Sequence, residues 1–248
     1  MGTGEEGRQR DVAEGGLFGA ASEGGAGGET GAMVSAVREL AGTPKRVSVI
    51  VGRKRVAVLL VPQAMELGLA AGVVWTDEVA ARAGHCERVN AAKAMAMRRL
   101  AARARSRAEM LAWLGEKGFD AGVASEAVER LAEVGLIRDE DVAAEEARRG
   151  AAKGLSGRAI GERLAARGVD GSGDGSAQMS DRERALDVAR GIVGAELSRR
   201  AAGSVDVNVL ARRTFGALSR KGYEEEGARE AVERALGERG LRVEPRDV

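Results

Sequence analysis

The heptapeptide LGEKGFD at residues 114–120 recurs as LAARGVD at 164–170 and as LSRKGYE at 218–224. The copies share the pattern Leu-x-x-basic-Gly-apolar-acidic. Leucine suits the buried face of a helix, the basic residue suits its last turn, where the helix dipole favours a cation, and glycine suits the left-handed conformation that ends it. The apolar residue then folds back on the core, and the acidic residue starts the next helix. The sequence therefore predicts the same helix-turn-helix corner three times.

The spacing of these corners indicates an internal repeat. Their glycines are 50 and 54 residues apart, which suits a unit of about three helices. The string EAVER occurs at 126–130 and at 230–234, each time eight residues after a corner glycine, and Ser106 and Ser156 each precede one by 12 residues. The equivalent corner pairs are Gly118 and Phe119, Gly168 and Val169, and Gly222 and Tyr223, in which the second residue is predicted to plug the core.

Helix start and stop signals predict where the helices of each unit lie. Capping boxes begin at Ser106 and Ser180, each with Glu three residues later. The expected helices are 87–104, 107–117 and 121–134 in the first unit, 139–152 and 157–167 in the second, and 181–201, 207–221 and 225–238 in the third. The string GSGDGS at 171–176 stands where a third helix of the second unit should begin, and we expect a flexible connector there.

The residues before the helical units have a different composition. Residues 1–43 are rich in Gly and Glu and predict a disordered tail, with a frayed helix near 33–40. Two β-branched runs within 46–61 predict a hairpin, ended by Pro62 and followed by a short helix. The expected organisation is a tail at 1–43, a β-hairpin plus short helix extension at 44–84, and helical repeats at 87–137, 138–178 (with the Gly/Ser linker) and 179–240. The predicted fold class is mainly α, an elongated array of three tandem three-helix repeats behind a small β-hairpin/α segment.

Composition excludes several classes of protein. The chain has 248 residues with one Cys and one His, so neither a disulfide framework nor a His-rich metal site is expected. The longest apolar run, Val56 to Val61, is far shorter than the roughly 20 residues of a membrane helix. The acidic, Gly-rich first 30 residues do not resemble a secretory signal, so a cytoplasmic location is expected. Two Trp, one Tyr and three Phe are too few for a surface that stacks nucleic-acid bases.

The basic residues cluster although the net charge is only +1. A basic stretch recurs in each unit, and nearly all of these residues are arginines, which favour bidentate contacts with phosphate or carboxylate. A repeat array could line one surface with this charge and bind with salt-dependent affinity, and the alternative is a solvated helix face. The candidate residues for binding a partner or nucleic acid are Arg98, Arg99, Arg103, Arg105, Arg107, Arg148, Arg149, Lys153, Arg158, Arg163, Arg212, Arg213 and Arg220.

Nothing in the sequence favours catalysis. His85 and Cys86 have no partner at a catalytic or metal-ligand spacing, and no Gly-Lys-Ser/Thr phosphate loop occurs. Asp139 and Glu140 stand at a helix start, where capping accounts for them. We therefore expect no enzymatic activity, no catalytic residues, no metal and no cofactor.

Several of these strings resemble the RecX family of regulators of the RecA recombinase, and the resemblance spans residues 46–240. RSRAEML at 105–111, with KGF and GLI after it, is similar to the family's Arg-Ser-x-x-Glu-Leu, Lys-Gly-Phe and Gly-Leu-Ile-Asp-Asp strings. Residues 148–169 resemble its middle repeat and 218–223 its third, and the hairpin resembles an N-terminal extension of some members. The chain departs from the family at Val142, where an aromatic residue is usual, and at the Gly- and Ser-rich 171–176.

The resemblance implies a non-enzymatic, monomeric helical protein that binds RecA filaments on single-stranded DNA along their groove. It implies that the protein modulates, and most often inhibits, recombinase and ATPase activity in DNA repair and the SOS response. Weak direct contact with single- or double-stranded DNA and no contact with membranes are expected. Two alternatives are a helical-repeat protein whose main role is to bind nucleic acid directly, and a protein-binding scaffold.

Overall fold

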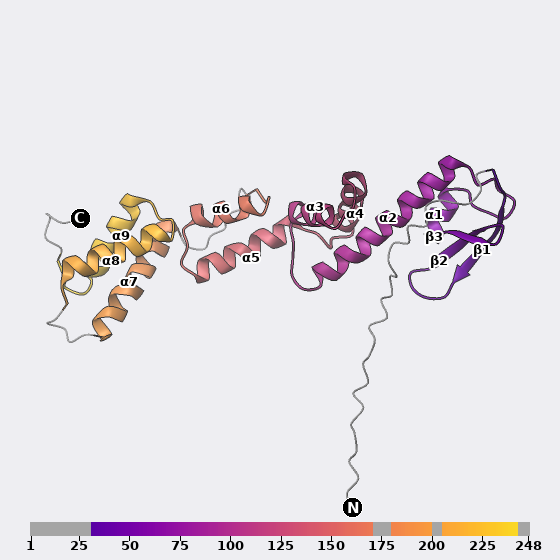
Figure 1. The fold of residues 1–248 in the computed structure, drawn as a ribbon. Coiled ribbons are helices and arrows are strands. Elements are labelled where there is room, and N and C mark those ends of the chain that lie inside the picture. The colour runs from indigo at the N-terminus through magenta and orange to yellow at the C-terminus, as the bar shows by residue number, and fades with distance from the viewer. Residues whose placement is uncertain (1–30, 171–179, 200–204, 243–248) are drawn as a thin grey trace, which may run out of the picture. The chain divides into compact units, whose positions relative to one another are not determined.

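The computed structural model describes residues 31–170, 180–199 and 205–242. The chain divides into two compact units, residues 1–88 and 89–248. Figure 1 labels the described elements, which are predominantly helical and include one small sheet. The predicted fold class, mainly α with a small β segment before helical repeats, is confirmed.

The first unit contains a three-stranded antiparallel sheet and a short helix (Figure 1). Its strands are β1 (Val34–Leu40), β2 (Arg46–Val51) and β3 (Lys54–Leu60), in the order β1-β2-β3. The predicted hairpin is the β2-β3 pair, and its turn contains Gly52 at a φ of +61°. Helix α1 (Val61–Glu66) follows directly, with Pro62 in its first turn, where a missing amide hydrogen costs nothing.

Strand β1 corrects the prediction for residues 31–43, which were expected to belong to a disordered tail with a frayed helix near 33–40. Val34 is only 1% exposed, and its amide donates to the Val73 carbonyl at 2.8 Å. The reason is tertiary: a lone hairpin is marginal in water, and a third strand gives it a stable sheet on which the fully buried Trp75 packs. Residues 1–30 of the predicted tail lie outside the described residues.

Helix α2 (Asp77–Leu100) also differs from its prediction, because it begins ten residues before the expected residue 87. The Thr76 hydroxyl accepts a hydrogen bond from the Val79 amide at 3.2 Å, and Asp77 and Glu78 lie in the first turn. This is an ordinary helix start that the sequence contained and the prediction missed. The first part of α2 packs in the core of the first unit, and Val89, Ala92 and Ala96 pack in the second unit.

The remaining helices lie within two residues of their predicted ranges. They are α3 (Arg107–Glu116), α4 (Ala121–Glu133), α5 (Asp139–Ala152), α6 (Gly157–Ala166), α7 (Asp181–Arg199), α8 (Val207–Arg220) and α9 (Glu225–Gly237). The predicted connector at 171–176 lies outside the described residues. None of the described helices is both long and apolar enough to cross a bilayer.

Three hydrophobic clusters form the cores of the helical part, one for each group of helices. The first joins α2, α3 and α4, and the last joins α7, α8 and α9. The middle cluster is the smallest and joins α5 and α6, with Val142, Leu164 and Val169 among its buried residues. Val142 is 1% exposed, so it fills this core where the family usually places an aromatic residue.

At all three corners the helix ends at a glycine whose backbone is in the left-handed conformation. The φ angles of Gly118, Gly168 and Gly222 are +86°, +67° and +89°. The residue after each glycine donates its amide to the carbonyl of the leucine five positions earlier: Phe119 to Leu114, Val169 to Leu164 and Tyr223 to Leu218. This is the Schellman arrangement, in which the apolar residue turns back against the helix that has ended. Val169 and Tyr223 are buried, and Phe119 is half-buried against its core.

Candidate functional site

Consecutive repeats meet where the glycine corner of one repeat packs on the N-terminus of the second helix of the repeat before it. The first junction joins the α3 N-terminus, from Ser106, to the corner at Arg167 and Gly168. The second junction joins the α6 N-terminus, from Ser156, to the corner at Lys221 and Gly222.

Ser106 is the centre of the first junction and is fully buried. Its hydroxyl donates to the Arg167 carbonyl at 2.6 Å and accepts from the Glu109 amide at 3.0 Å. The Glu109 carboxylate in turn accepts from the Ser106 amide at 3.0 Å, which completes the predicted capping box. The same serine therefore caps its own helix and holds the next repeat.

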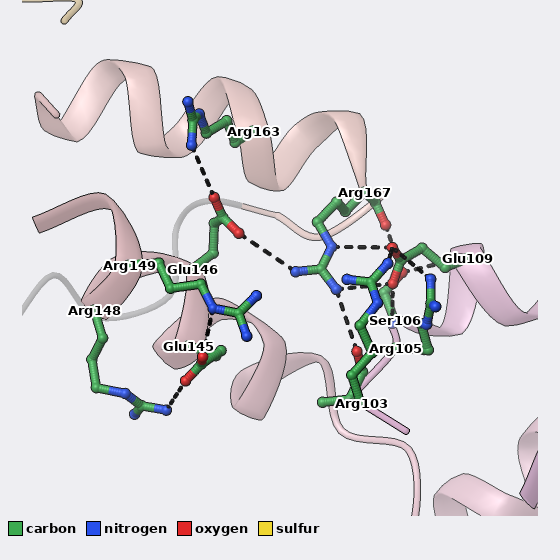
Figure 2. A network of polar contacts seen from close by, with 11 residues as sticks. Arg103, Arg105, Ser106, Glu109, Glu145, Glu146, Arg148, Arg149, Arg163 and Arg167 are labelled. Carbon is green, nitrogen blue, oxygen red and sulfur yellow. Dashed lines mark hydrogen bonds and ion pairs between the residues drawn. The ribbon is translucent and has the colours of Figure 1, made fainter. Parts of the chain in front are cut away.

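The first junction is also ionic (Figure 2). Arg167 donates to both Glu109 oxygens, at 3.2 and 3.0 Å, and lies 3.7 Å from Glu146 on α5. Arg103 and Arg105 approach the same Glu109 at 3.5 and 3.9 Å. Burial alone would raise the pKa of Glu109, but hydrogen bonds from Arg167 and from the Ser106 amide outweigh it and hold this pKa below its usual value.

Space requires glycine at the corner of this junction. A Cβ on Gly168 would lie 2.4 Å from the Cβ of Ala108, which is closer than two carbon atoms that are not bonded to each other can approach. The glycine is therefore needed twice, for its positive φ and for the close approach of the two repeats.

The second junction repeats this arrangement around the uncharged hydroxyl and amide of Ser156. The Ser156 hydroxyl donates to the Gly222 carbonyl at 2.7 Å, and the Ser156 amide donates to the Lys221 carbonyl at 3.0 Å. That amide is available because residue 159, where a capping-box Glu would stand, is Ala. A Cβ on Gly222 would lie 2.7 Å from the Cβ of Ala159, so this corner is as close-packed as the first.

Two further side chains join the second junction. The Tyr223 hydroxyl donates to the Gly154 carbonyl at 3.1 Å, and the Lys221 ammonium donates to the Lys153 carbonyl. Burial raises the pKa of Tyr223 to about 12, so its hydroxyl remains a donor well above neutral pH.

An aspartate from the following repeat completes each junction. Asp139 accepts from the Arg107 amide at 2.9 Å, and Asp181 accepts from the Gly157 amide at 2.9 and 3.0 Å. Each aspartate is the first residue of its own helix and binds an amide that the preceding repeat leaves free. The sequence predicted a local capping role for Asp139, and its contact with the previous repeat was missed.

Many of the predicted binding arginines pair with acidic residues of the chain itself. The pairs are Arg148 and Arg149 with Glu145 (2.5 and 2.7 Å), Arg158 with Glu162 (2.5 Å), Arg163 with Glu146 (3.6 Å) and Arg213 with Glu196 (3.1 Å). Arg98, Arg107, Lys153, Arg212 and Arg220 are exposed. Surface pairs of this kind hold their side chains weakly, so the arginines keep access to a partner, but the nearby carboxylates reduce the local positive charge.

The region from the end of α2 to the start of α3 differs from these surface pairs, because arginines outnumber acidic residues there. Arg99 stacks over the Trp113 ring, 4.4 Å from its centroid. Within the described residues, the Nε atoms of Arg99 and Arg105 are buried without a hydrogen-bond partner. Burial, and then the positive charges of Arg103 and Arg99, lower the pKa of Arg105. The structure thus brings Arg99, Arg103 and Arg105 close enough for their charges to interact.

Sequence reasoning missed Arg167 and Glu146, which join the first two repeats. Both were available from the pattern, because Arg167 holds the basic position of the second corner and Glu146 lies seven residues after Asp139 in α5. Among the described residues, no group of three or more His, Cys, Asp or Glu side chains could hold a metal ion.

Comparison with known proteins identifies the family. Residues 92–131 match the model of the RecX first three-helix domain. The regulatory protein RecX of Mycolicibacterium vanbaalenii is 36% identical over 147 residues, which are 57% of this chain and 80% of that protein. The chain belongs to the RecX family. The RecX of Mycobacterium avium is 38% identical over 144 residues, 57% of this chain and 82% of that protein.

Solved RecX structures share the fold at low sequence identity. One crystal structure of a regulatory protein RecX has a TM-score of 0.66 at 17% identity and covers 82% of this chain and 99% of its own. The RecX of Lactobacillus salivarius has a TM-score of 0.50 at 16% identity and covers 60% of this chain and 97% of its own. The RecX family is thus one of regulatory proteins, and its fold tolerates wide sequence change.

Proposed function

We propose that this RecX-family chain is a non-enzymatic, cytoplasmic regulator that binds the RecA filament on single-stranded DNA and inhibits its recombinase and ATPase activity, in DNA repair and the SOS response. The observation that carries the proposal is the cluster of guanidinium groups formed by Arg99, Arg103 and Arg105 around the loop between α2 and α3. We further propose that the repeats at 87–137, 138–178 and 179–240 contact the filament in succession.

The cluster has more positive charge than its surroundings neutralise. Arg103 and Arg105 lie 3.5 and 3.9 Å from Glu109, and Arg167 already donates to both oxygens of that carboxylate. Guanidinium groups packed together repel one another, and this repulsion falls when an anion binds between them. Arginine can also bind a phosphate or carboxylate group through two parallel hydrogen bonds. A DNA phosphate or an acidic side chain on the filament therefore suits this arginine cluster.

The first test is the rate of ATP hydrolysis by RecA on single-stranded DNA with increasing amounts of this protein. We expect the rate to fall and to recover as salt is raised, because charge carries the binding. An unchanged rate and an unchanged filament lifetime at saturating protein would contradict the proposal.

A variant locates the surface. Arg103→Ala with Arg107→Ala removes two exposed positive charges, and we expect roughly tenfold weaker inhibition, since each exposed charge contributes up to about 1 kcal/mol. Arg229→Ala is the matched control, because Arg229 is also exposed, at 44%, and pairs with Glu225 on a helix outside the basic stretches. An equal loss of inhibition in both variants would show that the arginine cluster around the α2–α3 loop has no special role.

Fluorescence anisotropy with single-stranded DNA and no RecA separates the proposal from direct nucleic-acid binding. We expect weak binding, in the micromolar range typical of non-specific contacts. Nanomolar affinity for DNA alone would instead favour a protein whose main role is to bind nucleic acid.

A further inference from the structure

Two of the three glycine corners are occupied by another repeat, and within the described part of the second unit the third is open. A Cβ on Gly168 would meet Ala108, and one on Gly222 would meet Ala159 and Ser156. A Cβ on Gly118 would meet no atom of the other described residues beyond its chain neighbours within 4 Å, although its φ of +86° and its Schellman hydrogen bonds match those of the other corners. The first corner therefore has the same shape as the other two, and no described helix of the second unit covers it.

The backbone carbonyls differ in the same way. At the occupied corners, Arg167, Lys221 and Gly222 accept hydrogen bonds from a serine of the preceding repeat. Among the described residues, no backbone amide donates a hydrogen bond to the carbonyl of Lys117 or of Gly118. These carbonyls end helix α3 and carry its partial negative charge, so they suit hydrogen-bond donors and the positive end of another helix dipole.

The occupied corners specify what such a helix must offer. Its N-cap needs a hydroxyl, as at Ser106 and Ser156. Its second or third residue must be small, as Ala108 and Ala159 are. The basic residue of the corner also reaches a carbonyl shortly before the N-cap: Arg167 lies 3.4 Å from that of Ala104, and Lys221 donates to that of Lys153. Lys117 holds the equivalent position in the first corner and is exposed.

We propose that the corner at Lys117, Gly118 and Phe119 is a docking site for a helix N-terminus of another protein, with Ser or Thr as its N-cap and Ala or Gly as its second or third residue. The hydroxyl and an N-terminal amide bind the Lys117 and Gly118 carbonyls, and the small residue packs against Gly118. The Lys117 ammonium binds a carbonyl just before the N-cap. This proposal does not depend on the arginine cluster or on the identity of the filament.

Among the described helices, a folded second copy offers no free N-terminus that fits the corner, because its own corners already cover those of α3 and α6. Helix α8 begins the last repeat in the position of α3 and α6, but its N-cap is Asp206, whose carboxylate accepts from amides of its own helix and replaces the serine hydroxyl. Its third residue, Val209, is large and 57% exposed. Ser180 does cap α7, but its hydroxyl donates to Glu183, and the second and third residues of α7, Arg182 and Glu183, are both large. The fit therefore favours a different protein as the partner.

The test uses a segment of the chain that already docks in this way. The probe is a synthetic peptide of residues 153–167, held helical by a lactam bridge in place of the exposed Arg158–Glu162 ion pair. It is titrated into the ¹⁵N-labelled full-length protein. We expect saturable NMR shifts at the amides of Gly118 and Phe119, and at least tenfold weaker binding by the same peptide with Ser156→Val and Ala159→Leu.

Two glycine variants provide the matched comparison. Gly118→Asn places a side chain in the open corner and should abolish the shifts, since asparagine tolerates a positive φ. Gly72→Asn carries the same backbone cost, because Gly72 has a φ of +89° and also has open space, and it should bind the peptide like the wild type. Thermal melting checks that both variants fold to similar stability.

Three results would overturn the proposal. The peptide could bind Gly118→Asn as tightly as the wild type. The shifts could be confined to Lys221, Gly222 and Tyr223, which would mean that the peptide only displaces α6 from its own corner. Sedimentation equilibrium could reveal self-association that Gly118→Asn abolishes, which would make a second copy the occupant.

Discussion

The two junctions between repeats share one sequence pattern and use different chemistry. In the first, Arg167 is held between Glu109 and Glu146, with side chains that are 12–20% exposed. In the second, neutral donors on Ser156 and Tyr223, both buried, bind backbone carbonyls. Both junctions keep the capping serine, the corner glycine and the facing alanine. The shape of the contact is therefore common to the repeats, and its electrostatics vary.

The difference arises mainly at the third residue of the receiving helix. Glu109 occupies the Ser106 amide, so Ser106 holds the next repeat through its hydroxyl alone and the carboxylate attracts Arg167. Ala159 leaves the Ser156 amide free, so Ser156 makes two bonds to the following corner. This residue thus decides whether a carboxylate and an arginine join the two repeats, so salt and acid should weaken the first junction more than the second.

The largest expected effect comes from substitution of a corner glycine, a feature common to both junctions. Gly222→Ala forces a Cβ to within 2.7 Å of Ala159 and Ser156 and strains a φ of +89°. Strain and overpacking together should lower the free energy of unfolding by about 2–4 kcal/mol. Gly118→Ala, at the open corner, carries the strain alone and should cost about 1–2 kcal/mol. Urea unfolding of both variants, followed by far-UV circular dichroism, measures the difference, and equal losses would contradict close packing at Gly222.

The next effect separates the junctions. Arg167→Met leaves Glu109 and Glu146 without their shared cation, and we expect a loss of about 2 kcal/mol at low salt. The loss should shrink in 1 M salt, because screening already weakens the wild-type contact. Hydrogen exchange at the amides of Gly168 and Val169 measures it locally. A loss that is equal at both salt concentrations would mean that Arg167 acts by packing and not by charge.

Tyr223→Phe is the corresponding change in the second junction and should have a smaller effect. It removes the hydroxyl that donates to the Gly154 carbonyl and leaves the ring in the core. We expect a loss of about 1 kcal/mol, as for a neutral hydrogen bond, with no dependence on salt. Hydrogen exchange at Leu155 and Ser156 measures it, and a salt-dependent loss would contradict the contrast between the junctions.

The sequence predicted the helices of the repeats well because their end signals are local. Ser106, Asp120 and Gly118 each act within a few residues, and each does in the structure what its type favours in any chain. Strand β1 was missed because its stability comes from β2 and Trp75, which short-range patterns do not contain. Long-range contacts also explain why the residues of the candidate site were predicted only in part.

The candidate arginines were found by counting charge along the chain, and counting cannot show which acids fold against them. It selected Arg148 and Arg149, which share Glu145, and did not select Arg167, which holds two repeats together. The repeat alignment had the information to find Arg167, since its equivalent Lys221 also bridges two repeats. Comparison of equivalent positions is therefore a better guide to this site than local charge density.

The smallest expected effect is a difference in pH dependence between the junctions. The pKa of folded Glu109 lies below its ordinary value of 4.5, so its contribution is fully present above pH 4.5 and is lost as the pH falls through the folded pKa. The pKa of Tyr223 is raised from 10.0 to about 12, so its contribution is present below pH 10 and is lost as the pH rises toward 12. The methyl groups of Ala108 and Ala159, which face the two corner glycines, report on each junction by ¹³C NMR. We expect the Ala108 signal to move first in acid and the Ala159 signal first in alkali. Glu109→Gln should remove the acid transition at Ala108 alone, and movement of both methyls in parallel would show that the junctions do not differ in charge.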